Sequence, residues 1–251
     1  MNKLPNLFGS ILILILSGCA TSTDNYSDPN DPFESFNRAS YRFNKAVDKV
    51  ILKPVTKGYD AIAPMPVKVG VSNFFSNLGE IPTIFNGLLQ GKIADAFSDT
   101  GRFLINSTLG LAGIMDVATD LGIEENDEDF GQTLGAWGFD SGAYIMLPLL
   151  GPTTIRDSLG IPLDGYLSFS RYVDHVPTRN TLYLARIVDL RYRLLPIDGQ
   201  LEDALDEYTF VKDAFLMHRE YQVYDGDPPE DEDFYDEYCD DEDECDDEVI
   251  D

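Results

Sequence analysis

The chain has 251 residues, of which 43% are hydrophobic, and this is enough apolar material for one or two domains with a core. Its 45 acidic and 18 basic side chains give a formal net charge of -27. Nucleic acid is therefore excluded as a partner, because its phosphates would be repelled. The charge is uneven, since residues 225–251 hold 17 of the acids and no lysine or arginine. We expect a folded body with unusual ends.

The amino terminus has the pattern of a secretory signal peptide. An apolar stretch covers residues 7–16 and as a helix would extend about 15 Å, roughly half of a bilayer's hydrocarbon core. Residues 16–19 read Leu-Ser-Gly-Cys and resemble the bacterial lipobox, whose cysteine receives diacylglycerol. A cysteine that merely follows an ordinary signal is the alternative. We expect removal of residues 1–18, lipidation of Cys19, and a polar tether over residues 19–30.

An amphipathic helix of about 18 residues is predicted next. Asp31 supplies an N-cap and Pro32 a first-turn proline. Apolar side chains recur on one face at three- and four-residue spacings up to Val50. The helix is expected to end before Pro54, because the residue before a proline avoids helical geometry.

The middle of the chain continues with helical spacing. Residues 67–90 predict two shorter helices, because Gly79 and Pro82 interrupt the apolar pattern. Residues 92–108 predict another helix. Residues 109–115 have almost no polar side chains, and they predict a helix that is apolar all round, buried in protein or in lipid but too short to span a bilayer.

Residues 131–151 form an apolar segment with a single charge, Asp140, and five glycines. Neither helical nor strand periodicity fits it, so it is predicted to be a flexible loop that covers a core or faces a membrane. Residues 153–157 indicate the start of a short helix.

Two helices follow in the last part of the body. One is predicted over residues 178–195 and ends at Pro196. The last begins after Asp198 and continues past Phe215. Since no alternating run is long enough to build a sheet, the fold class is predicted to be mostly α.

The acidic segment over residues 227–251 self-repels and is predicted to be a disordered tail. Cys239 and Cys245 lie within it and either pair in an oxidising compartment or remain free. Its carboxylates lack the spacing of a calcium loop, so simple solvation is favoured over diffuse cation binding and no metal site is predicted.

The sequence contains no recognisable catalytic constellation. His175 and His218 lie in no known motif. The serine in residues 138–142 is displaced by one position from a Gly-x-Ser-x-Gly elbow. We expect no enzyme activity and no cofactor.

Three arginines lie in or at the start of apolar helices, each with a carboxylate nearby in sequence. These pairs are Arg38 with Glu34, Arg102 with Asp99, and Arg156 with Asp157. Ion pairs on a helix face are one explanation. The other is that the guanidinium groups hold lipid phosphates or lock helices together beneath a bilayer surface.

Several stretches in this order resemble signature motifs of the MlaA (VacJ) family of outer-membrane lipoproteins, and the resemblance covers a helical domain over residues 31–226. The motif residues are Asp31, Pro32, Phe33, Glu34, Asn37, Arg38, Asn73, Phe74, Arg102, Asn106, Arg156 and Asp157. Ala143 departs from the proline that we expect in the family at this position.

The resemblance implies a ring of amphipathic helices in the plane of the membrane around an amphipathic channel. It implies a lipid-anchored protein of a Gram-negative outer membrane that faces the periplasm. Such proteins remove misplaced phospholipids from the outer leaflet and pass them to a periplasmic lipid carrier, commonly in association with trimeric porins. A structural lipoprotein that scaffolds porins without moving lipid is the alternative. Candidate residues of the channel and its gating hairpin are Phe130, Gly131, Trp137, Gly138, Phe139, Gly142, Tyr144, Leu147 and Pro148.

Overall fold

The computed structural model describes residues 31–229. The predictions for the signal peptide, the lipidated Cys19, the tether, Cys239 and Cys245 lie outside the described residues. Within residues 31–229 the chain is mostly helical, as predicted, and it contains one small antiparallel sheet. None of the helices in this range is both long enough and apolar enough to cross a membrane.

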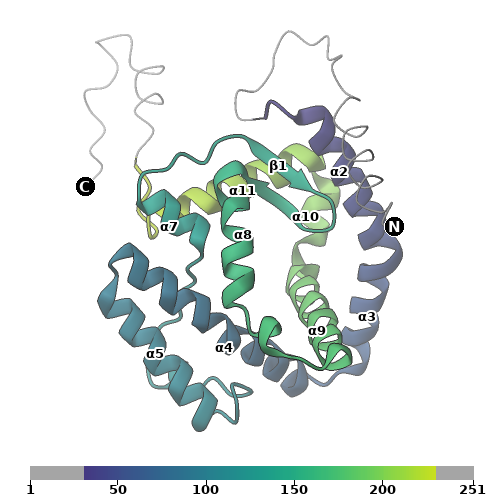
Figure 1. Ribbon diagram of the computed structural model, residues 1–251. Coiled ribbons are helices and arrows are strands. Elements are labelled where there is room, and N and C mark those ends of the chain that lie inside the picture. The colour runs from purple at the N-terminus through teal and green to yellow at the C-terminus, as the bar shows by residue number, and fades with distance from the viewer. Residues whose placement is uncertain (1–30, 230–251) are drawn as a thin grey trace, which may run out of the picture.

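Figure 1 shows α2 and α3 along one side of the molecule, α4 and α5 along the bottom and the opposite side, and the sheet near the top, with α8 and α9 between them. The elements, in chain order, are α2 (Glu34–Val47), the π-helix η1 (Asp48–Leu52), α3 (Lys53–Ile62), α4 (Met65–Gln90), α5 (Ile93–Thr108), α6 (Val117–Asp120), α7 (Phe130–Ala136), β1 (Tyr144–Leu147), β2 (Gly151–Thr154), α8 (Ile155–Leu167), the 3-10 helix η2 (Phe169–Tyr172), α9 (Val176–Leu194), the 3-10 helix η3 (Leu195–Ile197), α10 (Asp198–Asp203) and α11 (Glu207–Val223).

The first helix begins two residues later than predicted. Phe33, and not Asp31, occupies the N-cap position of α2. Asp31 is buried, and its carboxylate accepts hydrogen bonds from Asn37 Nδ2 at 2.7 Å and from the hydroxyl of Tyr208. The aspartate therefore ties the start of α2 to α11 instead of capping the helix.

The prediction that this helix ends before Pro54 is also wrong. The chain continues from α2 through η1 into α3 without leaving helical geometry. The backbone N–H of Lys53 bonds to the carbonyl of Asp48, five residues back. This wider π turn accommodates a proline, which has no N–H and whose ring crowds the carbonyl four residues before it.

The predicted pair of helices over residues 67–90 is a single helix, α4, which contains Pro82. Side chains within the helix bond to carbonyls near the proline: Thr83 Oγ1 donates to Gly79 O at 3.2 Å, and Asn86 Nδ2 donates to Pro82 O at 3.0 Å. Helix α5 packs against α4 close to Gly87, where an added Cβ would lie 3.6 Å from the Cβ of Ala96. Tertiary packing thus outweighs the local helix-breaking signals.

Residues 109–115 form turns and not the predicted helix. Leu111, Ala112 and Gly113 have φ values of 53°, 61° and 86°, all in the left-handed region. Gly113 lies so close to α4 that an added Cβ would be 2.6 Å from the Cβ of Asn77. Its N–H donates to Asn106 O at 2.8 Å. This compact turn leaves Leu109 and Leu111 exposed.

The carboxyl-terminal half agrees better with the sequence. Helix α8 begins where predicted, with Thr154 Oγ1 accepting from Asp157 N at 3.1 Å. Helix α9 also matches, although η3 carries the chain through Pro196. The prediction of a single last helix is wrong. Helices α10 and α11 are separate, because Asp206 caps α11 by accepting from Tyr208 N at 3.1 Å.

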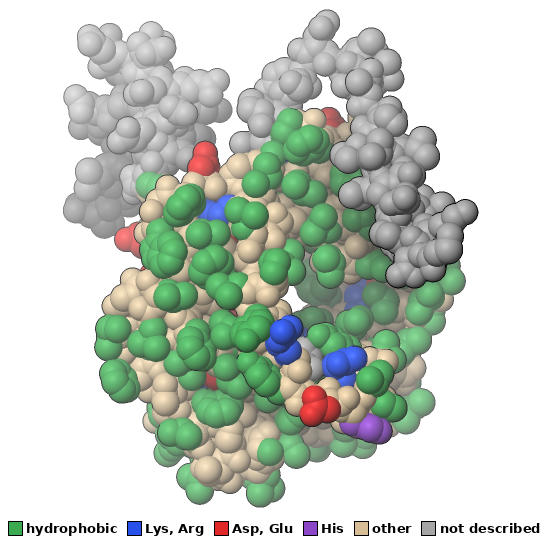
Figure 2. Space-filling view, in the orientation of Figure 1, with side chains coloured by type: hydrophobic (Ala, Val, Ile, Leu, Met, Phe, Trp, Pro, Cys, Tyr) green, Lys and Arg blue, Asp and Glu red, His purple; other side chains and the backbone are tan. Residues whose placement is uncertain are grey.

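The distribution of side chains is the reverse of that in a water-soluble globular domain. Within residues 31–229, 20 polar or charged residues are buried but only six hydrophobic ones are, while 43 large apolar or aromatic side chains are exposed. Apolar side chains cover much of the face in Figure 2. The apolar face of α2 points outward, with Phe36 41% and Phe43 49% exposed, and buried Asn37 and Ser40 point inward.

A small apolar cluster lies beneath the sheet. Tyr144 and Met146 of β1 pack on Tyr208 of α11, and Phe215 packs against them. The rings of Tyr144 and Tyr208 meet edge to face, with centroids 6.3 Å apart. This cluster anchors the sheet between α2 and α11.

Candidate functional site beneath the hairpin

The apolar segment over residues 131–151 is more ordered than predicted. Its first part is helix α7, and its last part belongs to a β hairpin in which Tyr144 pairs with Thr154 and Leu147 with Gly151. The expectation of no sheet was therefore wrong, because strands of four residues show too little alternation to be detected. Leu149 has a φ of 66° in the connecting turn.

Two asparagines of α2 hold the outer edge of β1. Asn37 donates from Nδ2 to Tyr144 O at 3.0 Å and accepts from Met146 N at 2.8 Å. One heptad later, Asn44 donates to Leu147 O at 2.9 Å and accepts from Leu149 N at 2.7 Å. Each amide satisfies one carbonyl and one N–H, as a neighbouring strand would do. The only sign of this contact in the sequence is that Asn37 and Asn44, seven residues apart, lie on one face of the helix.

The structure does not bring the nine predicted channel and hairpin residues together in one site. Phe130 and Gly131 belong to α7, and Tyr144 lies in the core. A pocket beneath the hairpin includes Gly138, Phe139 and Gly142 in its lining, while Leu147 lines a second pocket. Trp137 stacks edge to face on Phe130 and donates from Nε1 to Leu89 O at 3.1 Å, and Pro148 is exposed in the turn.

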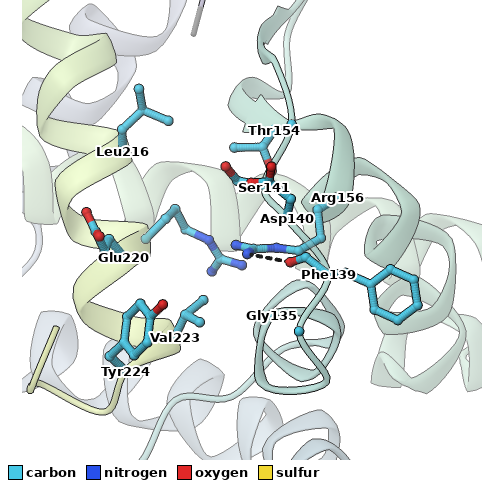
Figure 3. A pocket seen from close by; sticks show the side chains of 13 residues that line it. Gly135, Phe139, Asp140, Ser141, Thr154, Arg156, Leu216, Glu220, Val223 and Tyr224 are labelled. Carbon is cyan, nitrogen blue, oxygen red and sulfur yellow. Dashed lines mark hydrogen bonds between the residues drawn. The ribbon is translucent and has the colours of Figure 1, made fainter. Parts of the chain in front are cut away.

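The first pocket has a volume of about 390 Å³ and lies between the loop after α7, the start of α8, and α11. Figure 3 shows polar and apolar side chains facing it from both sides. Its lining residues are Gly135, Gly138, Phe139, Asp140, Ser141, Gly142, Thr154, Arg156, Leu216, Arg219, Glu220, Val223 and Tyr224. The combination of buried arginines with an apolar rim makes the pocket amphipathic.

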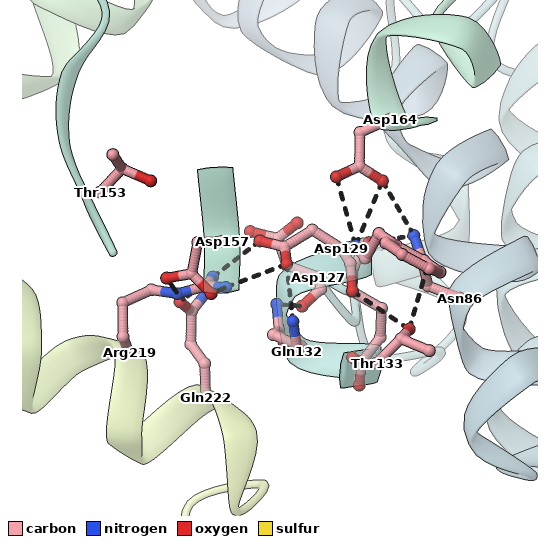
Figure 4. A network of polar contacts seen from close by, with 12 residues as sticks. Asn86, Asp127, Asp129, Gln132, Thr133, Thr153, Asp157, Asp164, Arg219 and Gln222 are labelled. Carbon is pink, nitrogen blue, oxygen red and sulfur yellow. Dashed lines mark hydrogen bonds and ion pairs between the residues drawn. The ribbon is translucent and has the colours of Figure 1, made fainter. Parts of the chain in front are cut away.

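Arg219 of α11 forms the structural centre of this region. Its Nε and Nη2 donate to both carboxylate oxygens of Asp157 at 3.0 Å, while Nη1 and Nη2 donate to Asp129 at 2.7 and 3.0 Å. Nη1 also donates to Gln222 Oε1 at 3.1 Å. All five N–H groups are thus used, as Figure 4 shows. Burial alone would raise the pKa of Asp129, but Arg219 outweighs it and holds that pKa below its usual value.

Arg156 is only partly used. It is 8% exposed, and it donates from Nε to Asp157 Oδ1 at 3.2 Å and from Nη1 to Phe139 O at 3.4 Å. Within residues 31–229, Nη2 has no partner. Figure 3 places its guanidinium group at the pocket wall. Arg156 therefore offers unused donors to the cavity, and its predicted pairing with Asp157 is confirmed.

A second polar network continues from Arg219 toward α4. The carboxylate of Asp164 accepts from Phe130 N at 3.2 Å and from Asn86 Nδ2 at 3.2 Å, and Thr133 Oγ1 donates to Asn86 Oδ1 at 3.0 Å (Figure 4). Burial raises the pKa of Asp164 to about 6 despite these hydrogen bonds. The second pocket, of about 250 Å³, lies beside this network.

Arg38 and Arg102, the other two arginines singled out in the sequence, connect neighbouring helices. Arg38 pairs with Glu34 at 2.6 Å, as predicted, and also with Asp206 at 2.7 Å, which joins α2 to α11. The predicted pairing of Arg102 with Asp99 is wrong. Arg102 is buried and pairs with Glu80 of α4 at 2.9 Å, because the sequence could not show which face of α5 meets α4.

The pairing of Arg102 and Glu80 is embedded in a wider polar cluster. Arg102 also pairs with Asp116 at 3.3 Å. Burial raises the pKa of Glu80 to about 7, although the hydrogen bond from Arg102 opposes this shift. Asn106 supports the same region by donating to Asp116 Oδ1 at 2.9 Å and accepting from Ala118 N at 2.9 Å.

The remaining residues of the predicted motifs contact neighbouring parts of the fold and line neither pocket. Asn73 donates to Ile114 O at 3.2 Å, and Phe74 stacks on Phe75. His175 and His218 are exposed. Within the described range, no group of three or more histidine, cysteine, aspartate or glutamate residues is placed to hold a metal ion. The sequence interpretation missed Arg219, because its two carboxylate partners are 62 and 90 residues away along the chain.

Comparisons with known proteins agree with this architecture. A family model described as MlaA lipoprotein matches residues 29–222. The chain is 34% identical to the intermembrane phospholipid transport system lipoprotein MlaA of Haemophilus influenzae, over 85% of this chain and 88% of the relative. It is 32% identical to the protein of the same name from Escherichia coli, over 82% of this chain and 84% of the relative. A solved structure from work on the structural basis for maintenance of bacterial outer membrane lipid asymmetry matches with a TM-score of 0.69 at 32% identity, over 77% of this chain and 98% of that one.

Proposed function

Because the chain belongs to the MlaA lipoprotein family, we propose that it is the outer-membrane lipoprotein of an intermembrane phospholipid transport system. In this role it removes misplaced phospholipids from the outer leaflet and passes them to a periplasmic carrier, and so maintains lipid asymmetry. The observation that carries the proposal is the inverted side-chain distribution, with 43 large apolar side chains exposed and 20 polar residues buried within residues 31–229. A hydrocarbon environment stabilises such a surface, whereas water does not.

The helices are proposed to lie in the plane of the membrane, as a ring within one leaflet. Their outward apolar faces suit this position, and their length and polarity do not suit a span. Figure 2 shows a hollow near the middle of the face, between the positions of α8 and α9 in Figure 1. Such a hollow is the proposed entrance of an amphipathic lipid channel. Signal cleavage and lipidation at Cys19 would hold the ring at the periplasmic side of the outer membrane.

The β hairpin and the glycine-containing loop before it are proposed to control access to the channel. Gly138 and Gly142 have φ values of 87° and 65°, conformations that other residues adopt only at a cost. The loop covers the pocket that contains Arg156. Movement of this loop would therefore open or close a polar cavity beside the apolar surface.

Trimeric porins and a periplasmic lipid carrier are proposed as partners on the basis of family membership. The large exposed apolar surface provides room for a membrane-embedded neighbour. Transport by this route moves lipids without breaking a covalent bond, so no catalytic residue is assigned. Pull-down of the lipidated protein from outer membranes would test the porin contact.

Deletion of the gene, followed by measurement of outer-leaflet phospholipid and detergent sensitivity, tests the transport function. We expect surface phospholipid to rise and the unaltered gene to restore it. Gly138→Trp should fail to restore it, because the new side chain strains the loop that covers the pocket. Gly58→Trp is the matched control, since Gly58 lies in α3 and a Cβ added there would have nothing within 4 Å. Full clearance of lipid by Gly138→Trp would instead favour a scaffold for porins.

A further inference from the structure

The pocket beneath the hairpin carries unused hydrogen-bond donors on Arg156 and two carboxylates that form no ion pair with a described residue. We propose that it binds the zwitterionic head group of an ethanolamine phospholipid, with the phosphodiester on Arg156 and the primary ammonium attracted by the carboxylates of Asp140 and Glu220, which line the pocket. This inference rests on the proposed lipid transport and names the class of lipid that the pocket prefers.

The phosphate half of the site rests on the unused donors of Arg156. The side chain is buried in the protein, yet Nη2 has no partner within residues 31–229 and Nη1 makes one long bond to Phe139 O. A guanidinium edge with free N–H groups matches two phosphate oxygens. Ser141 faces the same cavity and adds a hydroxyl donor. Arg219 is excluded as the phosphate ligand, because its five N–H groups are already engaged.

The charges around Arg156 favour a zwitterion over a simple anion. Arg156 and Arg219 are balanced by Asp129 and Asp157 at short distance. A bare anion would therefore add an uncompensated charge to a neutral cluster. A phosphodiester that carries its own ammonium group adds no net charge to the cluster.

The ammonium half of the site rests on two carboxylates. Asp140 comes from the loop after α7 and Glu220 from α11, and both line the pocket. Neither forms an ion pair with any described residue. Figure 3 shows Asp140 on the loop side of the pocket and Glu220 on the α11 side. A primary ammonium has three N–H donors and satisfies carboxylates in this position.

The rim of the pocket suits the rest of a lipid. Phe139, Leu216 and Val223 line it with apolar surface, against which glycerol and the first methylene groups can pack. The volume of about 390 Å³ accommodates a small head group. Phosphatidylglycerol lacks the cation, and phosphatidylcholine has methyl groups where the carboxylates require N–H donors.

The test is to equilibrate the purified, lipidated full-length protein with mixed micelles that contain equal amounts of phosphatidylethanolamine, phosphatidylcholine and phosphatidylglycerol. Bound lipid is then quantified by mass spectrometry. We expect enrichment of phosphatidylethanolamine over its share in the micelles. Asp140→Asn with Glu220→Gln should lower the ratio of bound phosphatidylethanolamine to phosphatidylglycerol about two- to fivefold, which is the range for exposed ion pairs. The charge-matched control Asp120→Asn with Glu124→Gln should leave the ratio unchanged, since both acids are exposed away from the pocket.

Two further arms complete the test. Arg156→Gln should lower total bound phospholipid, with folding checked by circular dichroism. Because both carboxylate substitutions are on exposed residues, they remain informative if the arginine variant does not fold. Free glycerophosphoethanolamine should compete only weakly, since it lacks acyl chains; strong competition would identify a soluble ligand and overturn the assignment to lipid. Bound lipid with no head-group preference would overturn the inference and leave transport standing, whereas no bound lipid and no clearance in cells would overturn the proposed function itself.

Discussion

At the scale of single residues, buried polar groups connect the helices, whereas apolar side chains do so in most domains. Arg219 shows this most clearly, because it joins α7, α8 and α11 through Asp129 and Asp157. Its guanidinium group is almost fully buried. Asp157 also pairs with Arg156, whereas Arg219 is the only ion-pair partner of Asp129 among the described residues.

Arg219→Met is expected to destabilise the protein by about 3–5 kcal/mol, because it leaves two carboxylates without their main partner in a buried cluster. Urea unfolding in detergent, followed by circular dichroism, measures the change. Arg38→Gln is the control, since Arg38 is 37% exposed and also bridges to α11; its loss should cost about 1 kcal/mol or less. Equal losses for the two variants would contradict the structural role given to Arg219.

Asp164 predicts a dependence of stability on pH. Burial raises its pKa from 3.8 to about 6 in the folded state. The folded state therefore holds more protons than the unfolded state between about pH 4 and 6, and this contribution to stability is full below that window and lost above it. Asp164→Asn should flatten the fall in stability between pH 4 and 6 and make the protein more stable at pH 7. Parallel pH profiles for the two proteins would contradict this assignment.

At the scale of elements, the hairpin depends on side chains of α2. Asn37→Ala removes a strand-like pair of hydrogen bonds with β1 as well as the bond to Asp31. We expect faster hydrogen exchange across β1 and β2, with α9 unchanged. Asn73→Ala is the control, since Asn73 makes one exposed bond to Ile114 O. Unaltered exchange in the hairpin would show that the core beneath it suffices.

Two glycines of α8 should respond in opposite ways to alanine. At Gly160 a Cβ would lie 2.9 Å from the backbone nitrogen of Gly131, so α7 and α8 must separate. At Gly165 nothing lies within 4 Å. Thermal unfolding should show that Gly160→Ala destabilises the protein, whereas Gly165→Ala stabilises it by about 0.5–1 kcal/mol, the difference in helix propensity. Stabilisation by both would mean that the two helices are not in close contact.

The sequence predicted the elements that depend on local signals and missed those set by packing. Helices α5, α8 and α9 follow from apolar spacing and caps. The continuation through Pro54 and Pro82 was missed, because the first involves a π turn and the second a helix that packs against α5. Pairing of Arg102 with Glu80 was missed because residues 22 positions apart meet only after α4 and α5 pack.

At the scale of the whole molecule, the apolar faces of the helices were correctly identified, but periodicity does not show whether such a face points inward. Phe36 and Phe43 form a regular stripe on α2 and are 41% and 49% exposed. In a soluble protein the same stripe would be the core. The family resemblance supplied the direction, and the buried polar residues agree with it.

The most direct test is to measure where the outer side chains lie in a membrane. Trp137 is the sole tryptophan of the chain, so Phe97→Trp and Val50→Trp can each be read alone in a Trp137→Phe background, at positions that are both 73% exposed. After reconstitution into lipid bilayers, we expect lipids with brominated acyl chains to quench both probes strongly and aqueous acrylamide to quench them barely. Full quenching by acrylamide with none by brominated chains would contradict an apolar surface embedded in lipid.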